Sequence, residues 1–185
     1  MCTCAISAPL ETLLLAVALS EMSRLGLISD THNHTQNVAH AVACFEAEGI
    51  HTVLHAGDVT RSGILKLFTP FDLWLAWGNV DRDEKLPELM AVEGSGSAHL
   101  AYVHSLSLGG CKLALLHGDN IPQLTHLIQS GDYDYVIHGH THRLRDELIG
   151  HTRVINPGAC GGSGLSPKTF AILDLATGDL QVLEA

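Results

Sequence analysis

Residues 25–59 have the sequence LGLISDTHNHTQNVAHAVACFEAEGIHTVLHAGDV, whose pattern indicates the class of fold. The apolar run Leu25–Ser29 predicts a strand, and apolar residues at helical spacing over Thr35–Glu48 predict a helix. Gly49 is placed to end that helix in a left-handed conformation, and His51–Ala56 predicts a second buried strand. Two strands joined through a helix predict a parallel sheet.

The elements beyond this stretch change from parallel to antiparallel. A helix over Arg61–Phe68 and a third strand over Phe71–Trp77 continue the first pattern. Predicted strands Leu100–Leu108 and Lys112–Leu116 then flank Gly109-Gly110, a dipeptide suited to a tight hairpin turn. The remaining predictions are a helix at about Ile121–Ser130, a strand over Tyr133–His138, and hairpins around Gly150 and Gly178-Asp179. We expect an α/β fold with two packed mixed sheets.

One domain is predicted over residues 23–185, after an N-terminal leader of residues 1–22. The leader contains an apolar run, Leu13–Leu19, which is shorter than the ~20 residues of a membrane span and has no basic region before it. We therefore expect a cytoplasmic protein without a membrane anchor. The leader is expected to be disordered, a short amphipathic helix or the product of an upstream start codon, because Met22 directly precedes the domain.

Composition limits the classes of function. The 20 acidic residues outnumber the 10 basic ones, and the resulting charge of −10 argues against stable binding of nucleic acid or anionic membranes. The 5 cysteines form neither a disulfide framework nor a zinc-finger pattern. The 13 histidines outnumber lysine and arginine together, which makes metal chemistry the first hypothesis. A homo-oligomer is compatible with the sequence.

Residue types that bind metals follow the predicted strands. They are Asp30, His32, Asp58, Asn79, His117, His140 and His142. Because the carboxyl ends of parallel strands meet in one crevice, we expect these side chains to converge. In extended backbone, the i and i+2 residues of Asp-x-His and His-x-His would point the same way. Each signal alone is common in turns, but their recurrence favours a catalytic site for Mn²⁺, Ni²⁺, Fe²⁺, Mg²⁺ or Zn²⁺.

These motifs together resemble those of the calcineurin-like metallophosphoesterases. The matching segments are Asp30-Thr31-His32, Gly57-Asp58, Gly78-Asn79-Val80-Asp81, His117-Gly118-Asp119 and Gly139-His140-Thr141-His142. The short chain, Val80 and Asn156-Pro157-Gly158 resemble the small prokaryotic YfcE-type phosphodiesterase branch. The resemblance implies a four-layer α/β/β/α sandwich with two mixed β-sheets and a dinuclear metal centre.

The resemblance also implies a role for each of these residues. Asp30, His32 and His142 would hold one divalent metal ion, Asn79, His117 and His140 the second, and Asp58 would bridge them. Two cations about 4 Å apart can activate a bridging water, so we expect a small phosphoester, most simply a phosphodiester, to be hydrolysed by a metal-bridging hydroxide. Mn²⁺ is the first expectation, and Asn79, His117 and Asp58 are the expected catalytic residues.

One position departs from the superfamily pattern. Many members have histidine directly after the asparagine, where it assists the leaving group, and this chain has Val80. Loss of such a general acid typically costs ~10² to 10⁴ in rate, so poor leaving groups should react slowest.

The sequence favours the phosphodiesterase over two other functions. Metallo-β-lactamase-like hydrolases begin with His-x-His-x-Asp-His, but Gln36 and Asn37 stand where aspartate and histidine would be required. A non-catalytic protein-interaction scaffold of the same fold, as in the retromer subunit, would have lost metal ligands. All the expected ligand types are present here, which favours an enzyme.

Overall fold

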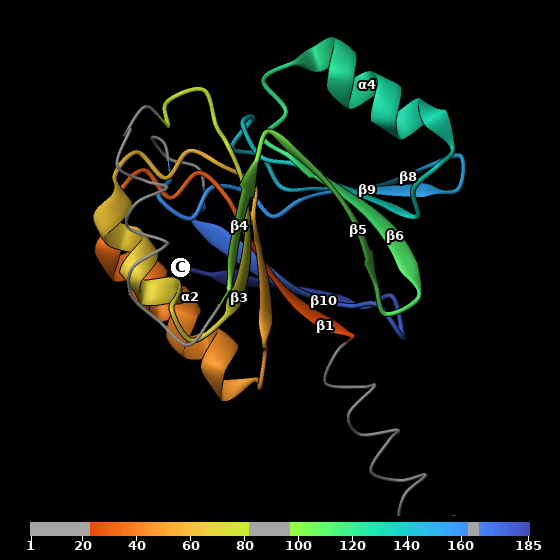
Figure 1. Cartoon of the computed structure of the whole chain (residues 1–185). Helices are drawn as coiled ribbons and strands as arrows, with labels where there is room; N and C mark the ends of the chain where they lie inside the picture. Colours follow the sequence, from red (N-terminus) through yellow and green to blue (C-terminus); the bar gives the residue numbers. More distant parts are fainter. Residues whose placement is uncertain (1–22, 82–96, 163–166) are drawn as a thin grey trace, which may run out of the picture.

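Two β-sheets pack against each other in the computed structural model, which describes residues 23–81, 97–162 and 167–185 (Figure 1). The predicted leader lies outside these residues. The strands of the first sheet are β1 (Arg24–Ile28), β2 (Thr52–His55), β3 (Asp72–Ala76), β4 (Ala98–Ala101), β10 (Thr169–Asp174) and β11 (Leu180–Glu184). Those of the second are β5 (Val103–Leu108), β6 (Cys111–Leu116), β7 (Tyr135–Ile137), β8 (Arg145–Ile149) and β9 (Thr152–Asn156).

Both sheets are mixed, with parallel strands at their centres. The first has the strand order β11-β10-β1-β2-β3-β4 and the second β5-β6-β7-β9-β8. Strands β1 to β4 are parallel to one another, as are β6, β7 and β9, whereas β10, β11, β5 and β8 pair antiparallel with their neighbours. The carboxyl ends of β1, β2, β3, β6 and β7 are followed directly by the residues of the candidate site.

Helices cover the outer faces of the sheets. The helix α2 (Thr35–Ala47) and the 3₁₀ helix η1 (Ser62–Phe68) lie on the first sheet, and α4 (Ile121–Ser130) lies on the second (Figure 1). Three buried apolar clusters fill the spaces between the layers: one under α2 and η1, one between the sheets and one under α4. This arrangement confirms the predicted four-layer α/β/β/α sandwich.

The helix α2 shows how the sequence pattern produces packing. Its apolar residues at helical spacing, among them Val38 and Phe45, are all buried against the first sheet. Gly26 of β1 makes room for the Phe45 ring, because a Cβ at that position would lie 3.0 Å from its atoms. Burial of one such side chain stabilises the fold by roughly 1.5–3 kcal/mol. Gly49 follows the helix with φ +65°, as predicted.

The hairpin predictions are confirmed. Gly109 and Gly110 have φ values of +55° and +81°, which suit a tight turn between β5 and β6. Gly150 lies between β8 and β9, and Gly178 between β10 and β11. Glycine at these positions provides positive φ without steric cost.

Two predictions about elements were wrong. The single strand predicted over Leu100–Leu108 is divided, because β4 pairs with β3 in the first sheet and β5 pairs with β6 in the second. The chain crosses between the sheets at Tyr102, whose side chain is 77% exposed. Apolar residues in both halves concealed this crossing. The helix predicted over Arg61–Phe68 is a 3₁₀ helix over Ser62–Phe68.

Among the described residues, no helix is long and apolar enough to cross a membrane.

Candidate metal centre

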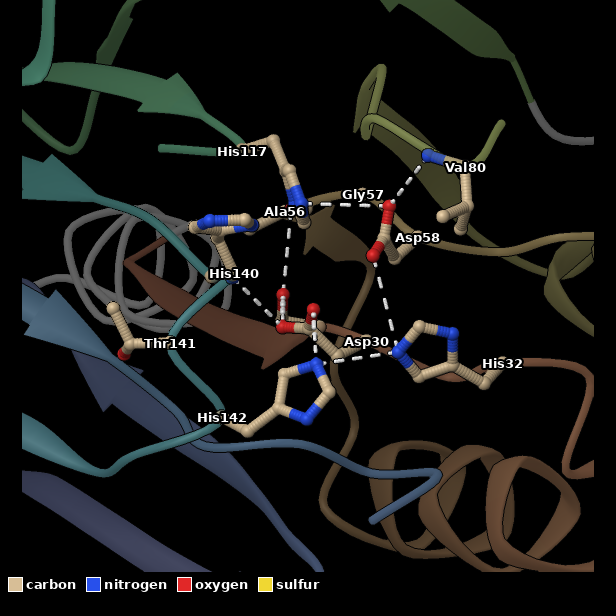
Figure 2. A network of polar contacts seen from close by, with 12 residues as sticks. Asp30, His32, Ala56, Gly57, Asp58, Val80, His117, His140, Thr141 and His142 are labelled. Atoms are coloured by element: carbon tan, nitrogen blue, oxygen red, sulfur yellow. Dashed lines mark hydrogen bonds and ion pairs between the residues drawn. The ribbon is translucent and has the colours of Figure 1, made fainter. Parts of the chain in front are cut away.

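The structure brings all the predicted ligand residues together at the carboxyl ends of the central strands, and Figure 2 shows all of them except Asn79. Asp30 and His32 follow β1, Asp58 follows β2 and Asn79 follows β3. His117 follows β6 in the second sheet, and His140 and His142 follow β7. The two sheets therefore contribute side chains to one site from opposite sides.

One group of ligand atoms comes from Asp30, His32, Asp58 and His142. Atoms of these residues lie within 4.8 Å of one another. The Nε2 atoms of His32 and His142 are 3.2 Å apart, and His142 Nε2 lies 3.1 Å from Asp30 Oδ1. Imidazole nitrogens and carboxylate oxygens at this spacing form a donor set suited to a divalent transition metal.

A second group surrounds the side-chain oxygen of Asn79. Asn79 Oδ1 lies 3.0 Å from His117 Nε2 and 3.1 Å from His140 Nδ1. The imidazole rings of His117 and His140 meet edge to face, with centroids 5.1 Å apart. An amide oxygen between two imidazoles adds a ligand without adding charge.

Asp58 lies between the two groups (Figure 2). Its Oδ2 is 3.8 Å from His32 Nε2, and its Oδ1 is 3.4 Å from His117 Nε2. The Val80 backbone N–H donates to the same Oδ1 at 3.2 Å. One carboxylate therefore presents an oxygen to each group.

The hydrogen bonds of His117 show that this donor set fits a cation. Its Nδ1 donates to the Ala56 carbonyl at 2.7 Å, so a neutral imidazole in this orientation carries its acceptor lone pair on Nε2. That lone pair faces two other acceptors, Asn79 Oδ1 and Asp58 Oδ1. Acceptor atoms that face one another repel unless a cation lies between them, so the residues suit a metal.

Asp30 is the most deeply buried of the predicted ligand residues. Burial raises the pKa of its carboxyl above the usual value, opposed by a 2.5 Å hydrogen bond from the Ser29 hydroxyl to Oδ2. The His140 backbone N–H also donates to Oδ2, at 3.1 Å. Oδ1 has no hydrogen-bond partner among the described residues and faces His142. A cation at Oδ1 would offset the cost of burying this carboxylate.

The backbone conformation predicted for the two i, i+2 pairs was wrong. The Asp-x-His and His-x-His pairs were expected to converge because of extended backbone, but their members have positive φ. The values are +50° for Asp30, +42° for His32, +67° for His140 and +57° for His142. Asp58 has φ +58°. Left-handed backbone at non-glycine residues costs energy and recurs at functional sites, where surrounding contacts hold it in place.

Two supporting residues were not assigned a role from the sequence. The Asp81 carboxylate accepts the backbone N–H groups of Asp58, Thr60 and Gly78 at 2.8–2.9 Å, and so joins the loops after β2 and β3. Asn156 Nδ2 donates to Gly139 O at 2.8 Å and to Thr141 Oγ1 at 3.1 Å. Both residues lie in the quoted motifs, but most of their partners, such as Asp58 and Gly139, are distant in sequence.

Two further histidines have the buried, hydrogen-bonded positions predicted for them. His55 accepts the Gly57 N–H at Nδ1 and contacts the Thr31 hydroxyl through Nε2. Burial lowers the pKa of His55 to about 4, and that of His138 also to about 4. Both imidazoles are therefore neutral near pH 7.

Gly139 is expected to tolerate no side chain. A Cβ there would lie 1.9 Å from Ser29 Oγ and 3.0 Å from the Ala56 carbonyl oxygen. Gly139→Ala should therefore lower the free energy of unfolding by about 1–3 kcal/mol, the usual cost of overpacking. Urea denaturation measures this, with Gly63→Ala as the matched control because no atom lies within 4 Å of its added Cβ. Equal stabilities of the two variants would contradict the observed packing.

The fold and site define a class of protein: an α/β/β/α sandwich whose two sheets present histidines and carboxylates at one end. The chain belongs to the calcineurin-like phosphoesterase superfamily, whose domain matches residues 23–178. It is similar to the phosphodiesterase MJ0936 of Methanocaldococcus jannaschii, with 33% identity over 154 residues that cover 82% of this chain and 92% of the relative.

Solved structures agree with this assignment. A structure of an archaeal phosphodiesterase superposes with a TM-score of 0.79 at 31% identity, covering 88% of this chain and 99% of that one. Vacuolar protein sorting 29 of Cryptosporidium parvum gives 0.64 at 20% identity, with 88% and 96% covered. The E. coli phosphoesterase YfcE gives 0.62 at 18% identity, with 87% and 98% covered. The last two similarities show the fold alone.

Proposed function

We propose that this protein is a dinuclear metal-dependent phosphodiesterase. The observation that carries the proposal is the position of Asp58, whose two carboxylate oxygens face different groups of ligand atoms. Asp30, His32 and His142 would hold one metal ion, and Asn79, His117 and His140 the other. The similarity to a relative named a phosphodiesterase supports the same reaction class. We also propose that residues 23–185 form one domain.

The chemistry of the residues favours Mn²⁺ over Ca²⁺, because imidazole nitrogens predominate over oxygen ligands. Two divalent cations here would lower the pKa of a water molecule and neutralise phosphoryl charge during an in-line displacement. The carboxylates of Asp30 and Asp58 offset only part of the charge of two such ions. An anionic phosphoester can therefore enter the site although the whole chain carries a charge of −10.

Hydrogen bonds within the protein orient the side chains of the proposed metal centre. Hydrogen bonds from Val80 and to Ala56 fix the orientations of Asp58 and His117. Asp81 holds the loops that carry Asp58 and Asn79 through their backbone N–H groups. These contacts fix the site before the substrate binds, which is how preorganised groups contribute most to catalysis.

The test is a substrate panel with the full chain supplied with Mn²⁺. Bis-p-nitrophenyl phosphate should be hydrolysed faster than p-nitrophenyl phosphate, and cyclic nucleotides and alkyl diesters complete the panel. Stoichiometric metal binding without turnover of any ester under several cations would overturn the proposal. That result would support the protein-interaction scaffold instead.

Because Val80 cannot donate a proton, we expect kcat/KM of the native protein to depend steeply on the pKa of the leaving group. The Val80 side chain is 37% exposed beside Asn79, so Val80→His places an imidazole there without displacing buried atoms. The variant should hydrolyse alkyl diesters on the order of 10²-fold faster and nitrophenyl diesters little faster, because only the former need a proton during cleavage. A plot of kcat/KM against leaving-group pKa measures the difference.

Val80→Ala is the control for the loss of the native side chain. For Val80→Ala, the plot of kcat/KM against leaving-group pKa should keep the slope of the native protein, since neither valine nor alanine can donate a proton. Parallel plots for native protein and Val80→His would show that another group already protonates the leaving group.

A further inference from the structure

A cavity of about 780 Å³ lies between α4 and the segment that joins β7 to β8. Ile121, Leu124 and Ile128 of α4 form an apolar wall, and Leu144 and Ile149 lie among the other lining residues. Its volume falls within the ~300–1,000 Å³ typical of small-molecule sites. The apolar lining with a few polar groups is also typical of such sites.

The cavity lies behind the loop that carries two proposed metal ligands. His140 and His142 face the candidate metal centre, whereas His138 and Thr141 line the cavity. Figure 2 shows the Thr141 side chain turned away from the ligand side chains. The loop therefore separates two sites, and the cavity is not part of the proposed catalytic centre.

His138 supplies independent evidence for a ligand. His138 is only 2% exposed, and its Nε2 atom has no hydrogen-bond partner among the described residues. Nδ1 lies 3.1 Å from the Gly139 carbonyl oxygen and 3.5 Å from Asn156 Nδ2, so the hydrogen-bond contacts of the ring are made through Nδ1. A buried polar atom without a partner is unfavourable, and a polar group of an occupant at this end of the cavity would offset that cost.

The charged lining residues indicate the charge of the occupant. Arg145 Nη2 lies 2.9 Å from Glu147 Oε2, so these two charges offset each other. Arg143 also lines the cavity, and no ion pair joins its guanidinium to another described residue. The cavity thus has a cationic side in a chain with a charge of −10. A guanidinium suits carboxylate, sulfonate or phosphate groups.

We infer that this cavity binds a small amphipathic anion, whose apolar body packs on α4 and whose acidic group pairs with Arg143. The site is separate from the phosphodiesterase centre, and the inference does not depend on that activity. The volume, the apolar wall and the cationic side indicate an amphipathic anion, and the unpartnered His138 nitrogen indicates a polar group in the lining that lacks a partner.

Fluorescence titration of the full chain with 8-anilinonaphthalene-1-sulfonate tests the inference, because this probe combines an aromatic body with a sulfonate. Saturable binding at one site is expected. Arg143→Glu and Leu144→Glu should each raise the Kd for the probe about tenfold or more, and a tenfold increase is equivalent to ~1.4 kcal/mol of binding free energy. Arg61→Glu and Leu148→Glu are matched controls outside the cavity lining and should leave the Kd within about twofold.

Competition distinguishes the acidic groups. Decanoate and decyl phosphate share an apolar body, and both should displace the probe better than neutral decanol; the stronger of the two identifies the preferred head group. Thermal unfolding checks that each variant is folded, which is expected since Leu144 is 52% exposed.

Three results would overturn the inference. The first is equal Kd values for cavity and control variants, and the second is displacement by decanol as strong as by the anions. The third is a dimer in light scattering that Leu144→Glu dissociates, because a second copy would then cover this face.

Discussion

Exhaustive chelation is expected to abolish phosphodiester hydrolysis, and Mn²⁺ or Ni²⁺ should restore it far better than Ca²⁺. The proposed ligands are mainly imidazole nitrogens with two carboxylates and one amide oxygen, whereas Ca²⁺ prefers six to eight oxygen ligands. A neutral His117 ring presents its Nε2 lone pair to acceptor oxygens of Asp58 and Asn79, an arrangement that a cation between them stabilises. The measurement is kcat/KM for bis-p-nitrophenyl phosphate in chelated protein, repeated after titration with each metal.

Thermal unfolding gives a second, independent readout of the same titration. A cation that binds only the folded state stabilises it by about 2.7 kcal/mol at a hundredfold excess over its Kd. Mn²⁺ should therefore raise the Tm of chelated protein more than Ca²⁺ does. Full hydrolytic activity in metal-free protein would contradict the proposed mechanism, and stabilisation without activity would support metal binding alone.

The fold could be predicted from the sequence because its central strands and helices are regular. The apolar spacing in Thr35–Glu48 and the glycine after it predict α2 correctly, since one face of that helix is buried. By contrast, the apolar pattern of Leu100–Leu108 did not show that this segment forms two strands. Its apolar residues pack in two different sheets, and pairing with β3 or β6 is a long-range property.

The membership of the candidate site was predictable, but its local geometry was not. Polar residues after parallel strands converge because of topology, which brings Asp30 and His117 to one end of the sandwich. Positive φ at Asp30 and His142 depends on contacts with other loops, and no spacing rule indicates it. Asp81 was missed for the same reason, because it acts through backbone N–H groups of a loop about 20 residues away.

The cavity beside α4 was also beyond sequence analysis. Leu124 and Ile128 fit an ordinary buried helix face, and Leu144 and Arg143 look like surface residues of a loop. Their convergence around an unpartnered His138 nitrogen depends on how α4 packs on the second sheet.

Asp58→Asn is expected to be among the most damaging single substitutions in the chain. The native carboxylate is 4% exposed and presents Oδ1 to the His117 group and Oδ2 to the His32 group. Asparagine keeps the shape but replaces one oxygen with an NH₂ group and removes the negative charge, so both proposed metal sites lose a ligand or its charge. We expect kcat/KM to fall on the order of 10³-fold or more, beyond the 10²–10³ typical of one lost transition-state contact.

The controls separate this effect from a general loss of structure. Asp132→Asn makes the same chemical change at an exposed position, and Cys44→Ser changes a half-buried side chain of α2 that contacts His40, which is not a proposed ligand; both variants should retain native activity. Metal content by elemental analysis should fall in Asp58→Asn and remain native in the controls. If Asp58→Asn lost activity but kept both metals at native affinity, Asp58 would act on the substrate and not as the shared ligand. If all three variants lost activity equally, the assignment of this centre as the active site would be wrong, because the damage would not depend on where the charge lies.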